Sequence, residues 1–200
     1  CLNELHHHCA HLHQRPLPRL LELQPQGLVP TPATVDTLDA ASAFLAKIAA
    51  EDGRGAVRQF DMPDLEVLAT LEARCFVHQQ EGHSVLVWTE LPATEQGKPP
   101  IVFVDQVGIT RNARQRYTHG SGYDYGVLGL LLAALTRHVG QVFASPPPWV
   151  YLVCARPIAW KYGLYGFRQA KADEHGALHA AGMGVNPSEG EVVMVLAPAA

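Results

Sequence analysis

The spacing of hydrophobic positions separates the first part of the chain from the rest. Residues 1–33 contain several prolines and five of the eleven histidines, and they show no sustained period. From Asp36, "DTLDAASAFLAKIAAEDG" has apolar residues at helical spacing, acids at its start and Gly53 as a stop, which predicts a helix over residues 36–53. We expect a leader over residues 1–33, with a helical part and then a linker, followed by one domain over residues 34–200.

Alternating and β-branched segments predict the strands of this domain. "HSVLVWTEL" (83–91) alternates apolar and polar residues, and "PIVFVDQVGIT" (100–110) is β-branched and apolar. "PPPWVYLVCA" (146–155) has the composition of another strand. We also expect two closing strands in "GALHAAGMGV" (176–185) and "GEVVMVLAPA" (190–199).

Three further segments predict helices. "MPDLEVLATLEARCF" (62–76) has Pro63 near its start. "VLGLLLAALTRHVG" (127–140) is apolar nearly all round and ends at Gly140, which is typical of a buried helix. "RPIAWKYGLYGF" (156–167) has Pro157 in its first turn and Gly166 just past its end. The order of these elements predicts an α/β sandwich around a mixed sheet.

Composition narrows the class of protein. Apolar residues make up 48% of the chain and charged residues 17%, as in a globular protein with a sizeable core. A net charge of −4 does not indicate a nucleic-acid partner, and the apolar run "VLGLLLAAL" is too short to cross a bilayer. The four cysteines follow no disulfide framework spacing. We therefore expect reduced thiols in a cytoplasmic protein with no membrane partner.

The histidines of the leader raise the question of a metal site. His7 with His11, and Cys9 with His13, are spaced to share one helix face, as metal ligands can. No second cluster at a known zinc spacing completes four ligands. We therefore expect no native metal.

A strand, a loop rich in arginine and glycine, and a helix start follow one another over residues 100–140. Free N–H groups at a helix start favour an anion, and glycine lets a phosphate approach the backbone closely. The loop "RNARQRYTHGSGYDYG" (111–126) is neither a P-loop nor a dinucleotide fingerprint, because G-K-[ST] and G-x-G-x-x-G are absent. Its positive charge comes from Arg111, Arg114, Arg116 and His119.

These segments resemble the GNAT N-acetyltransferase superfamily over about residues 100–168. "ITRNARQR" (109–116) is similar to the end of the family's central strand, and "GVLGLLLAAL" (126–135) to the helix after its pyrophosphate loop. "KYGLYGF" (161–167) matches the ending Y-x-x-x-G-F, with Tyr162 at the family's tyrosine. The resemblance implies a GNAT-like α/β sandwich: a mixed, mostly antiparallel sheet with helices on both faces and splayed central strands.

The resemblance also implies a reaction. An acyl group, acetyl in the family's usual chemistry, would pass from acyl-CoA (acetyl-CoA as cosubstrate) to a primary amine of a small molecule or a protein by direct attack. That chemistry needs a base for the amine, stabilisation of the thioester oxygen and an acid for the leaving thiolate. The resemblance leaves the acceptor and the acyl chain length open and allows a homodimer.

Tyr162 is the residue that the resemblance implies as the acid. A tyrosine stays protonated at neutral pH and can donate its proton to a thiolate of lower pKa. Packing of the short helix against the sheet is the structural alternative for Tyr162, and Tyr165 is the second candidate for the acid.

Asp105 is the candidate base, four residues before Ile109, where many family members have a carboxylate on the strand. Burial between apolar residues would raise its pKa towards neutrality. Strand alternation predicts that it shares a face with Phe103 and Val107. The alternative is a carboxylate that points outward or pairs with an arginine. Rival bases are His78, His83 and Glu90.

The resemblance assigns cosubstrate contacts to three groups of residues. Amides at the start of the 127–140 helix are candidates for the pyrophosphate, and loop arginines for the phosphates, with a solvated loop as the alternative. Backbone groups at the splayed end of the 100–110 strand would hold the oxyanion and the acyl arm. The candidates are Gly126, Val127, Leu128, Gly129, Arg114, Arg116, Val107 and Ile109.

Departures from the family pattern leave a second function open. Nine residues, "YTHGSGYDY" (117–125), stand where a standard member has none, and Leu128 occupies the place of the second glycine. These features favour the alternative of a catalytically degenerate GNAT-fold module that binds acyl-CoA or a protein partner. A cysteine hydrolase using Cys154 lacks a recognisable elbow and a third partner, and buried strand cysteines are usually inert.

Overall fold

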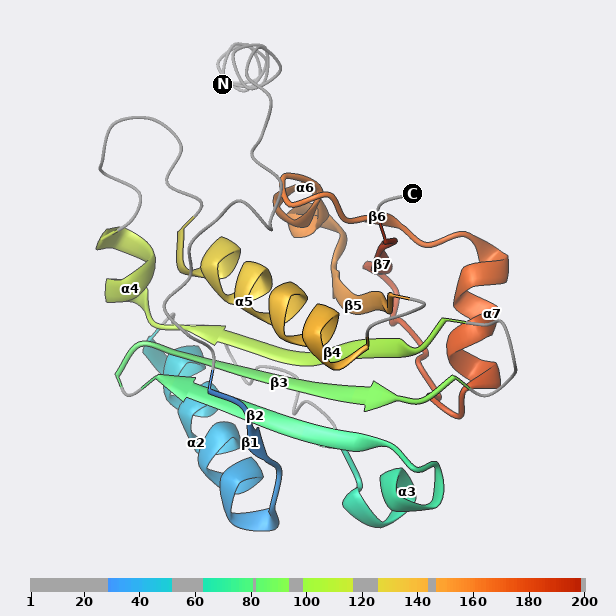
Figure 1. Ribbon diagram of the computed structural model, residues 1–200. Coiled ribbons are helices and arrows are strands. Elements are labelled where there is room, and N and C mark those ends of the chain that lie inside the picture. Colours follow the sequence, from blue (N-terminus) through green and yellow to red (C-terminus); the bar gives the residue numbers. More distant parts are fainter. Residues whose placement is uncertain are drawn as a thin grey trace, which may run out of the picture.

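The computed structural model describes residues 29–51, 63–80, 82–93, 99–116, 126–143 and 147–198. Within these ranges, seven strands form one sheet in the order β1-β2-β3-β4-β5-β7-β6 (Figure 1). The strands are β1 (Thr31–Pro32), β2 (Arg74–Gln80), β3 (Ser84–Leu91), β4 (Ile101–Ile109), β5 (Trp149–Ala155), β6 (Arg168–Gln169) and β7 (Glu191–Leu196).

The sheet is mixed but mostly antiparallel. The neighbours β4 and β5 run parallel, whereas the other paired strands run antiparallel. The β4–β5 connection crosses over through the buried helix α5 (Gly126–Val142), as a parallel pair requires. The sequence prediction of a mixed, mostly antiparallel α/β sandwich is confirmed.

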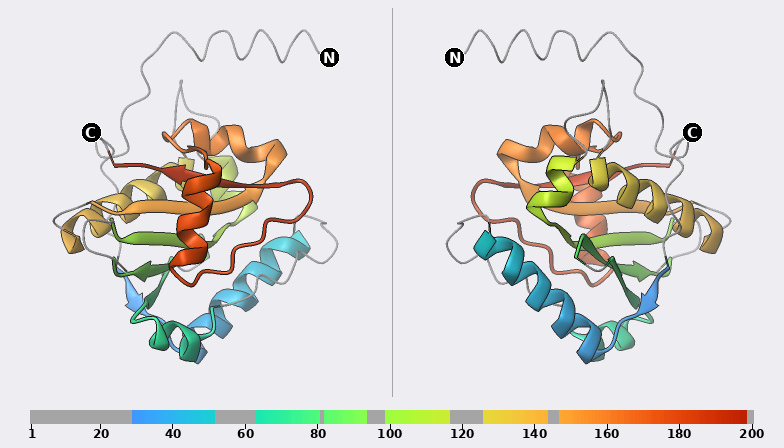
Figure 2. Two further views of the ribbon diagram at one scale, coloured as in Figure 1. Left: turned by 90° about the vertical axis from the view of Figure 1, so that its right-hand side faces the viewer. Right: turned by 90° about the vertical axis from the view of Figure 1, so that its left-hand side faces the viewer.

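Helices cover both faces of the sheet (Figure 2). Helix α5 packs on one face over alternate residues of the central strands, among them Trp88, Val104 and Leu152. On the other face, α2 (Val35–Glu51) and α7 (Ala172–Ala180) cover the intervening residues, among them Val87 and Phe103. Shorter helices are α3 (Leu65–Thr70), α4 (Arg111–Arg116), η2 (Arg156–Ile158) and α6 (Ala159–Gly163).

Several predicted elements occur close to their expected bounds. The helix expected over 36–53 is α2, and the one expected over 127–140 is α5. The strands expected over 83–91, 100–110, 146–155 and 190–199 are β3, β4, β5 and β7. The sheet also includes β1, which lies within residues 1–33, where we expected a leader; residues 1–28 lie outside the described part.

Three predictions of secondary structure are wrong. The helix expected over 62–76 ends at Thr70, and β2 follows after a reversal at Glu72, whose φ of 54° is left-handed. Residues 111–116, expected in a loop, form α4, because Thr110 accepts a hydrogen bond from the Ala113 amide at the helix start. The strand expected over 176–185 does not form. Residues 176–180 belong instead to α7, where the Glu174 carboxylate accepts a hydrogen bond from the Lys171 amide.

Candidate functional site

The two parallel central strands separate halfway along their length. They pair from Ile101 with Trp149 to Val104 with Leu152, and the pairing stops there. Beyond that point β4 stays paired with β3, and β5 stays paired with β7. Over residues 105–109 one edge of β4 therefore pairs with no other strand in the described part of the chain. This opening is the splay expected from the sequence.

A β-bulge lies at the point where the strands separate. Val87 pairs with Gln106 and Trp88 pairs with Val104, so Asp105 is an extra residue that is opposite no residue of β3 in the strand register. A bulge changes the direction of the side chains that follow it. Asp105 consequently lies on the face of Phe103, whereas Val107 packs on the α5 face. The expectation that Asp105 shares a face with both residues is wrong for Val107.

Asp105 lies near Thr89 and Cys75 on the face covered by α2. The Thr89 hydroxyl donates a 2.9 Å hydrogen bond to the Asp105 carboxylate. Burial raises the pKa of Asp105 to about 7, although the Thr89 hydrogen bond acts in the opposite direction. Burial and the nearby Asp105 carboxyl raise the pKa of Cys75 to about 12, so this thiol stays neutral. Asp105 thus has the pKa of a group that exchanges protons near neutrality.

The Tyr162 segment follows β5 and is closed by a tight turn. The Tyr162 carbonyl accepts hydrogen bonds from the amides of Tyr165, at 2.9 Å, and Phe167, at 3.2 Å. Gly166 has a φ of +89°, which a residue with a side chain rarely adopts. The turn returns Phe167 to Tyr162, and their rings meet edge to face at 6.1 Å. The spacing Y-x-x-x-G-F is therefore the spacing of this turn.

Tyr162 lies on the opposite face of the sheet from Asp105. It packs against the core beneath α5, together with Cys154 of β5. Cys154 belongs to the part of β5 that has separated from β4. Burial, followed by the nearby Cys154 and Tyr165, raises the pKa of Tyr162 to about 12, so its hydroxyl keeps its proton at neutral pH. Tyr165, the second candidate for the acid, is partly buried in the same cluster.

Helix α5 begins near the end of β4 (Figure 1). Its first residue, Gly126, has a φ of +58°, and a Cβ there would meet no other atom within 4 Å. The glycine is thus needed for backbone conformation and not for space. The first amides of a helix have no partner within the helix, and they include the amides of Val127, Leu128 and Gly129. These amides and the helix dipole favour an anion at this end of the sheet.

Only some of the residues predicted to contact the phosphates lie in the described part of the chain. Arg114 is half-buried on α4 next to α5, and Arg111 is exposed. Arg116 ends α4, but its side chain lies outside the described part. Residues 117–125, including His119, also lie outside it. Val107 and Ile109 lie on the unpaired edge of β4 and pack partly against the core beneath α5.

The rival bases lie away from Asp105. The buried Glu90 carboxylate accepts hydrogen bonds from Trp88, at 3.1 Å, and Arg74, at 3.0 Å, on the α5 face. His83 is in the β2–β3 turn, and its carbonyl accepts a hydrogen bond from the Thr110 amide. His78 lies on β2, with its ring nitrogen 3.3 Å from the Val29 carbonyl oxygen. Within the described residues, none of these three side chains forms a hydrogen bond or an ion pair with Asp105.

Sequence reasoning missed the neighbours of both candidate residues. Thr89 and Cys75 become neighbours of Asp105 only through the pairing of β2, β3 and β4. Alternation in "HSVLVWTEL" does place Thr89 with Val87, but it cannot supply the register or the bulge. Cys154, discounted as a nucleophile, is buried, and burial, with a smaller contribution from Glu191, raises its pKa to about 11.

The described residues contain neither a metal-binding cluster nor a membrane-spanning helix. No three histidine, cysteine, aspartate or glutamate side chains among them lie together as a metal-binding group. The histidines of residues 6–13 fall outside the described ranges. No described helix has both the length and the apolar character needed to cross a bilayer.

Comparisons with known proteins give similarity at the level of structure. No family model and no curated protein matches the sequence. An acyl-CoA N-acyltransferase from Pseudomonas aeruginosa is 16% identical, with a TM-score of 0.46 over 86% of this chain and 100% of that one. The ribosomal-protein-S18-alanine N-acetyltransferase from Escherichia coli is 12% identical, with a TM-score of 0.43 over 86% and 96%.

A third similar structure was solved with a ligand. It is Arabidopsis thaliana Naa50 in complex with the bisubstrate analogue CoA-Ac-MVNAL. It is 12% identical, with a TM-score of 0.44 over 85% of this chain and 97% of that one. The element order and the mixed sheet of the present chain agree with the GNAT-like fold expected from its sequence.

Proposed function

We propose that this chain is a GNAT-type N-acyltransferase that transfers an acyl group, acetyl in the simplest case, from acyl-CoA to a primary amine. The observation that carries the proposal is the separation of β4 from β5 after Val104 and Leu152, with Asp105 and Tyr162 on its two sides. An opening between two strands offers unpaired backbone groups to an amide-containing arm such as pantetheine. The fold by itself does not specify a reaction, so the proposal depends on these groups.

The donor would approach from the α5 face. Its diphosphate would bind the free amides at the start of α5, where Gly126 opens the helix. Its pantetheine arm would lie along the unpaired edge of β4, residues 105–109. Backbone N–H groups of that edge would stabilise the negative charge that develops on the thioester oxygen.

The acceptor would approach from the α2 face, where Asp105 lies. Asp105 takes a proton from the ammonium or the attacking amine, since its pKa of about 7 matches the working pH. The amine nitrogen attacks the thioester carbon, forming the C–N bond, and the C–S bond then breaks. Tyr162 donates its hydroxyl proton to the departing sulfur and recovers a proton from solvent, and Asp105 releases the amine proton to solvent. No step needs a covalent enzyme intermediate, and the neutral, buried Cys154 agrees with this.

Calorimetric titration with acetyl-CoA tests the donor site. Leu128→Glu places a carboxylate among the amides at the start of α5, so we expect it to weaken acetyl-CoA binding about tenfold or more by repelling the diphosphate. Acids in the first turn stabilise a helix, so the fold should persist. The control is Gln141→Glu, which adds the same charge at the exposed far end of α5 and should change the affinity by less than twofold.

The outcomes of this titration separate the two functions considered. Absence of heat and of thermal stabilisation in the parent protein would contradict a donor site altogether. Binding without release of CoA thiol in the presence of a panel of primary amines would favour the degenerate module that binds acyl-CoA. Binding with amine-dependent thiol release would support the enzyme.

A further inference from the structure

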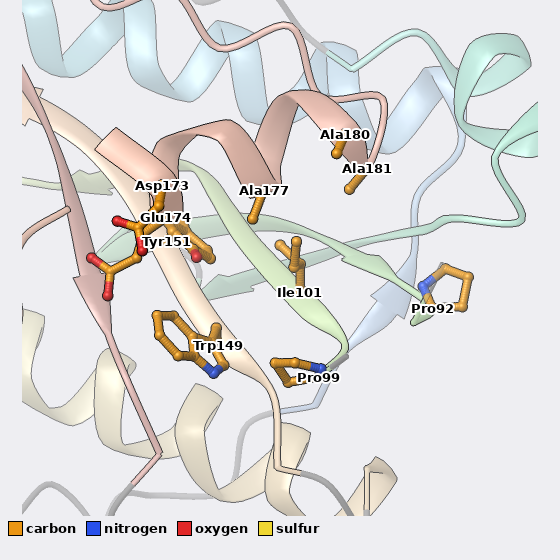
Figure 3. A pocket seen from close by; sticks show the side chains of 10 residues that line it. All are labelled: Pro92, Pro99, Ile101, Trp149, Tyr151, Asp173, Glu174, Ala177, Ala180 and Ala181. Atoms are coloured by element: carbon orange, nitrogen blue, oxygen red, sulfur yellow. The ribbon is translucent and has the colours of Figure 1, made fainter. Parts of the chain in front are cut away.

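A cavity of about 210 Å³ lies away from the opening between β4 and β5 (Figure 3). It is bounded by α7 and by the first residues of the parallel strands, Ile101 and Trp149. Its volume equals that of roughly seven water molecules in the liquid. The described residues that line it are Pro92, Pro99, Ile101, Trp149, Tyr151, Asp173, Glu174, Ala177, Ala180 and Ala181.

The apolar walls have a distinct composition. Trp149 and Tyr151 stack on the same side of β5, with ring centroids 6.3 Å apart and an interplanar angle of 22°. Opposite them, α7 presents alanines, whose small side chains leave the space open (Figure 3). Aromatic walls bind flat or alkyl groups through apolar contact, and the faces of such rings attract cations.

The charged groups of the cavity are acidic. Asp173 and Glu174 lie at one end of the cavity and Pro92 at the other (Figure 3). Arg168 donates two hydrogen bonds to the Glu174 carboxylate and lowers its pKa to about 2, so Glu174 is ionised and already paired. Asp173 is exposed and forms no ion pair with another described residue. One negative charge therefore remains beside the aromatic walls, and no described lining residue is cationic.

We propose that this cavity binds a small organic cation, namely an ammonium group carried on a compact aryl or alkyl body. The body would lie between the Trp149 and Tyr151 rings and the alanines of α7, and the ammonium group would face Asp173. The cavity is separate from the proposed transfer site. Ile101 lies four residues before Asp105 on β4, roughly 13 Å along the strand, and the buried Phe103 lies between them on the same face.

The probe for this site is 2-phenylethylamine, with 2-phenylethanol as its neutral counterpart. Binding is followed by Trp fluorescence and by chemical shifts of Trp149 and Ala177 in the full chain. We expect saturable binding of the amine and about fivefold weaker binding of the alcohol, from loss of one partly screened charge interaction.

Paired variants assign the binding to the cavity. Asp173→Asn should weaken the amine about fivefold and leave the alcohol unchanged, whereas Asp39→Asn on the exposed surface of α2 removes the same charge without effect. Ala177→Leu should abolish binding by filling the cavity, whereas Ala172→Leu, outside the cavity on the same helix, should not.

Three results would overturn the proposal: no saturable binding of the amine, equal affinity for amine and alcohol, or equal effects of Asp173→Asn and Asp39→Asn. The exposed aspartate variants keep the test valid even if Ala177→Leu fails to fold. Because the probe is titrated without acyl-CoA, failure here leaves the proposed transferase activity untouched. Success here does not depend on that activity either.

Discussion

Asp105 and Tyr162 lie on opposite faces of the sheet, beside the opening between β4 and β5. Both side chains are shielded from water, and burial is the largest cause of both raised pKa values. For the carboxyl, burial brings the pKa to about 7, where it can accept a proton. For the phenol, burial takes the pKa to about 12, which keeps the hydroxyl protonated at neutral pH.

Tyr162→Phe should separate catalysis from binding. We expect amine-dependent thiol release to fall on the order of a hundredfold, because the leaving sulfur loses its proton donor. The affinity for acetyl-CoA, measured by calorimetry, should change less than about twofold, since the ring and its contact with Phe167 remain. Tyr165→Phe is the matched control and should retain near-parental turnover. If Tyr165→Phe caused the loss instead, the acid role of Tyr162 would be wrong.

Asp105→Asn should change how stability depends on pH. The folded pKa of about 7 is above the ordinary value of 3.8, so the folded protein binds this proton more tightly than the unfolded chain. Its contribution to stability is therefore full below about pH 4 and is lost as the pH rises to about 7. Asparagine does not titrate, so this loss is absent from the variant. The free energy of unfolding of the variant relative to the parent should therefore be higher at pH 8 than at pH 4, by about 2–4 kcal/mol.

Urea unfolding of both proteins at several pH values measures this difference. Asp39→Asn, at an exposed aspartate beyond the first turn of α2, serves as the control, and its difference from the parent should change less between pH 4 and pH 8 than that of Asp105→Asn. A constant difference between Asp105→Asn and the parent from pH 4 to 8 would show that the Asp105 carboxyl titrates as an ordinary acid.

At the scale of elements, α2 and β4 approach each other closely at Gly108. A Cβ at this position would lie 2.6 Å from Leu45 Cδ2, 3.0 Å from Val85 Cγ1 and 3.1 Å from Ile48 Cδ1. The absence of a side chain at Gly108 thus lets the Leu45 and Ile48 side chains of α2 pack closely on β4 beyond the bulge.

Gly108→Ala should destabilise the fold by about 1–3 kcal/mol, because the side chains of Leu45, Val85 and Ile48 must shift to admit the methyl group. Gly140→Ala, in α5, is the control: its Cβ would meet no atom within 4 Å, and alanine in a helix should stabilise by roughly 0.5–1 kcal/mol. Denaturant unfolding of the two variants compares them directly. Equal stability of Gly108→Ala and the parent would contradict a tight α2–β4 contact.

The sequence predicts a helix or a strand well where a single hydrophobic period dominates the segment. Helix α2 and strands β3, β4 and β7 follow their hydrophobic patterns. Helix α7 was missed because glycine and alanine dilute its pattern, although the acids of its first turn and Gly182 after its end, at a φ of +85°, are helix signals. Strand β2 was missed because neither glycine nor proline separates it from α3; the chain reverses at Glu72 instead.

The candidate site could be predicted only in part. Tyr162 and the turn at Gly166 follow from local spacing, which the sequence contains. The bulge at Asp105 and its contact with Thr89 depend on strand register, which no single strand specifies. The cavity beside Trp149 requires α7, so a sequence reading that places a strand there cannot find it.

At the scale of the whole molecule, the two faces of the sheet have different proposed tasks. The α5 face holds Tyr162 and the start of α5, where the donor would bind. The opposite face holds Asp105, where the amine would approach, and the cavity beneath α7. The opening between β4 and β5 lies between the two faces, so the donor and the amine would meet there.

A crystal structure of the protein with a hydrolysis-resistant thioether analogue of acetyl-CoA measures this directly. We expect the diphosphate at the amides that begin α5, the pantetheine along residues 105–109 of β4, and the sulfur between Asp105 and the Tyr162 hydroxyl. An analogue bound elsewhere on the molecule, or β4 and β5 paired along their full length with the Tyr162 hydroxyl directed away from the sulfur, would contradict it.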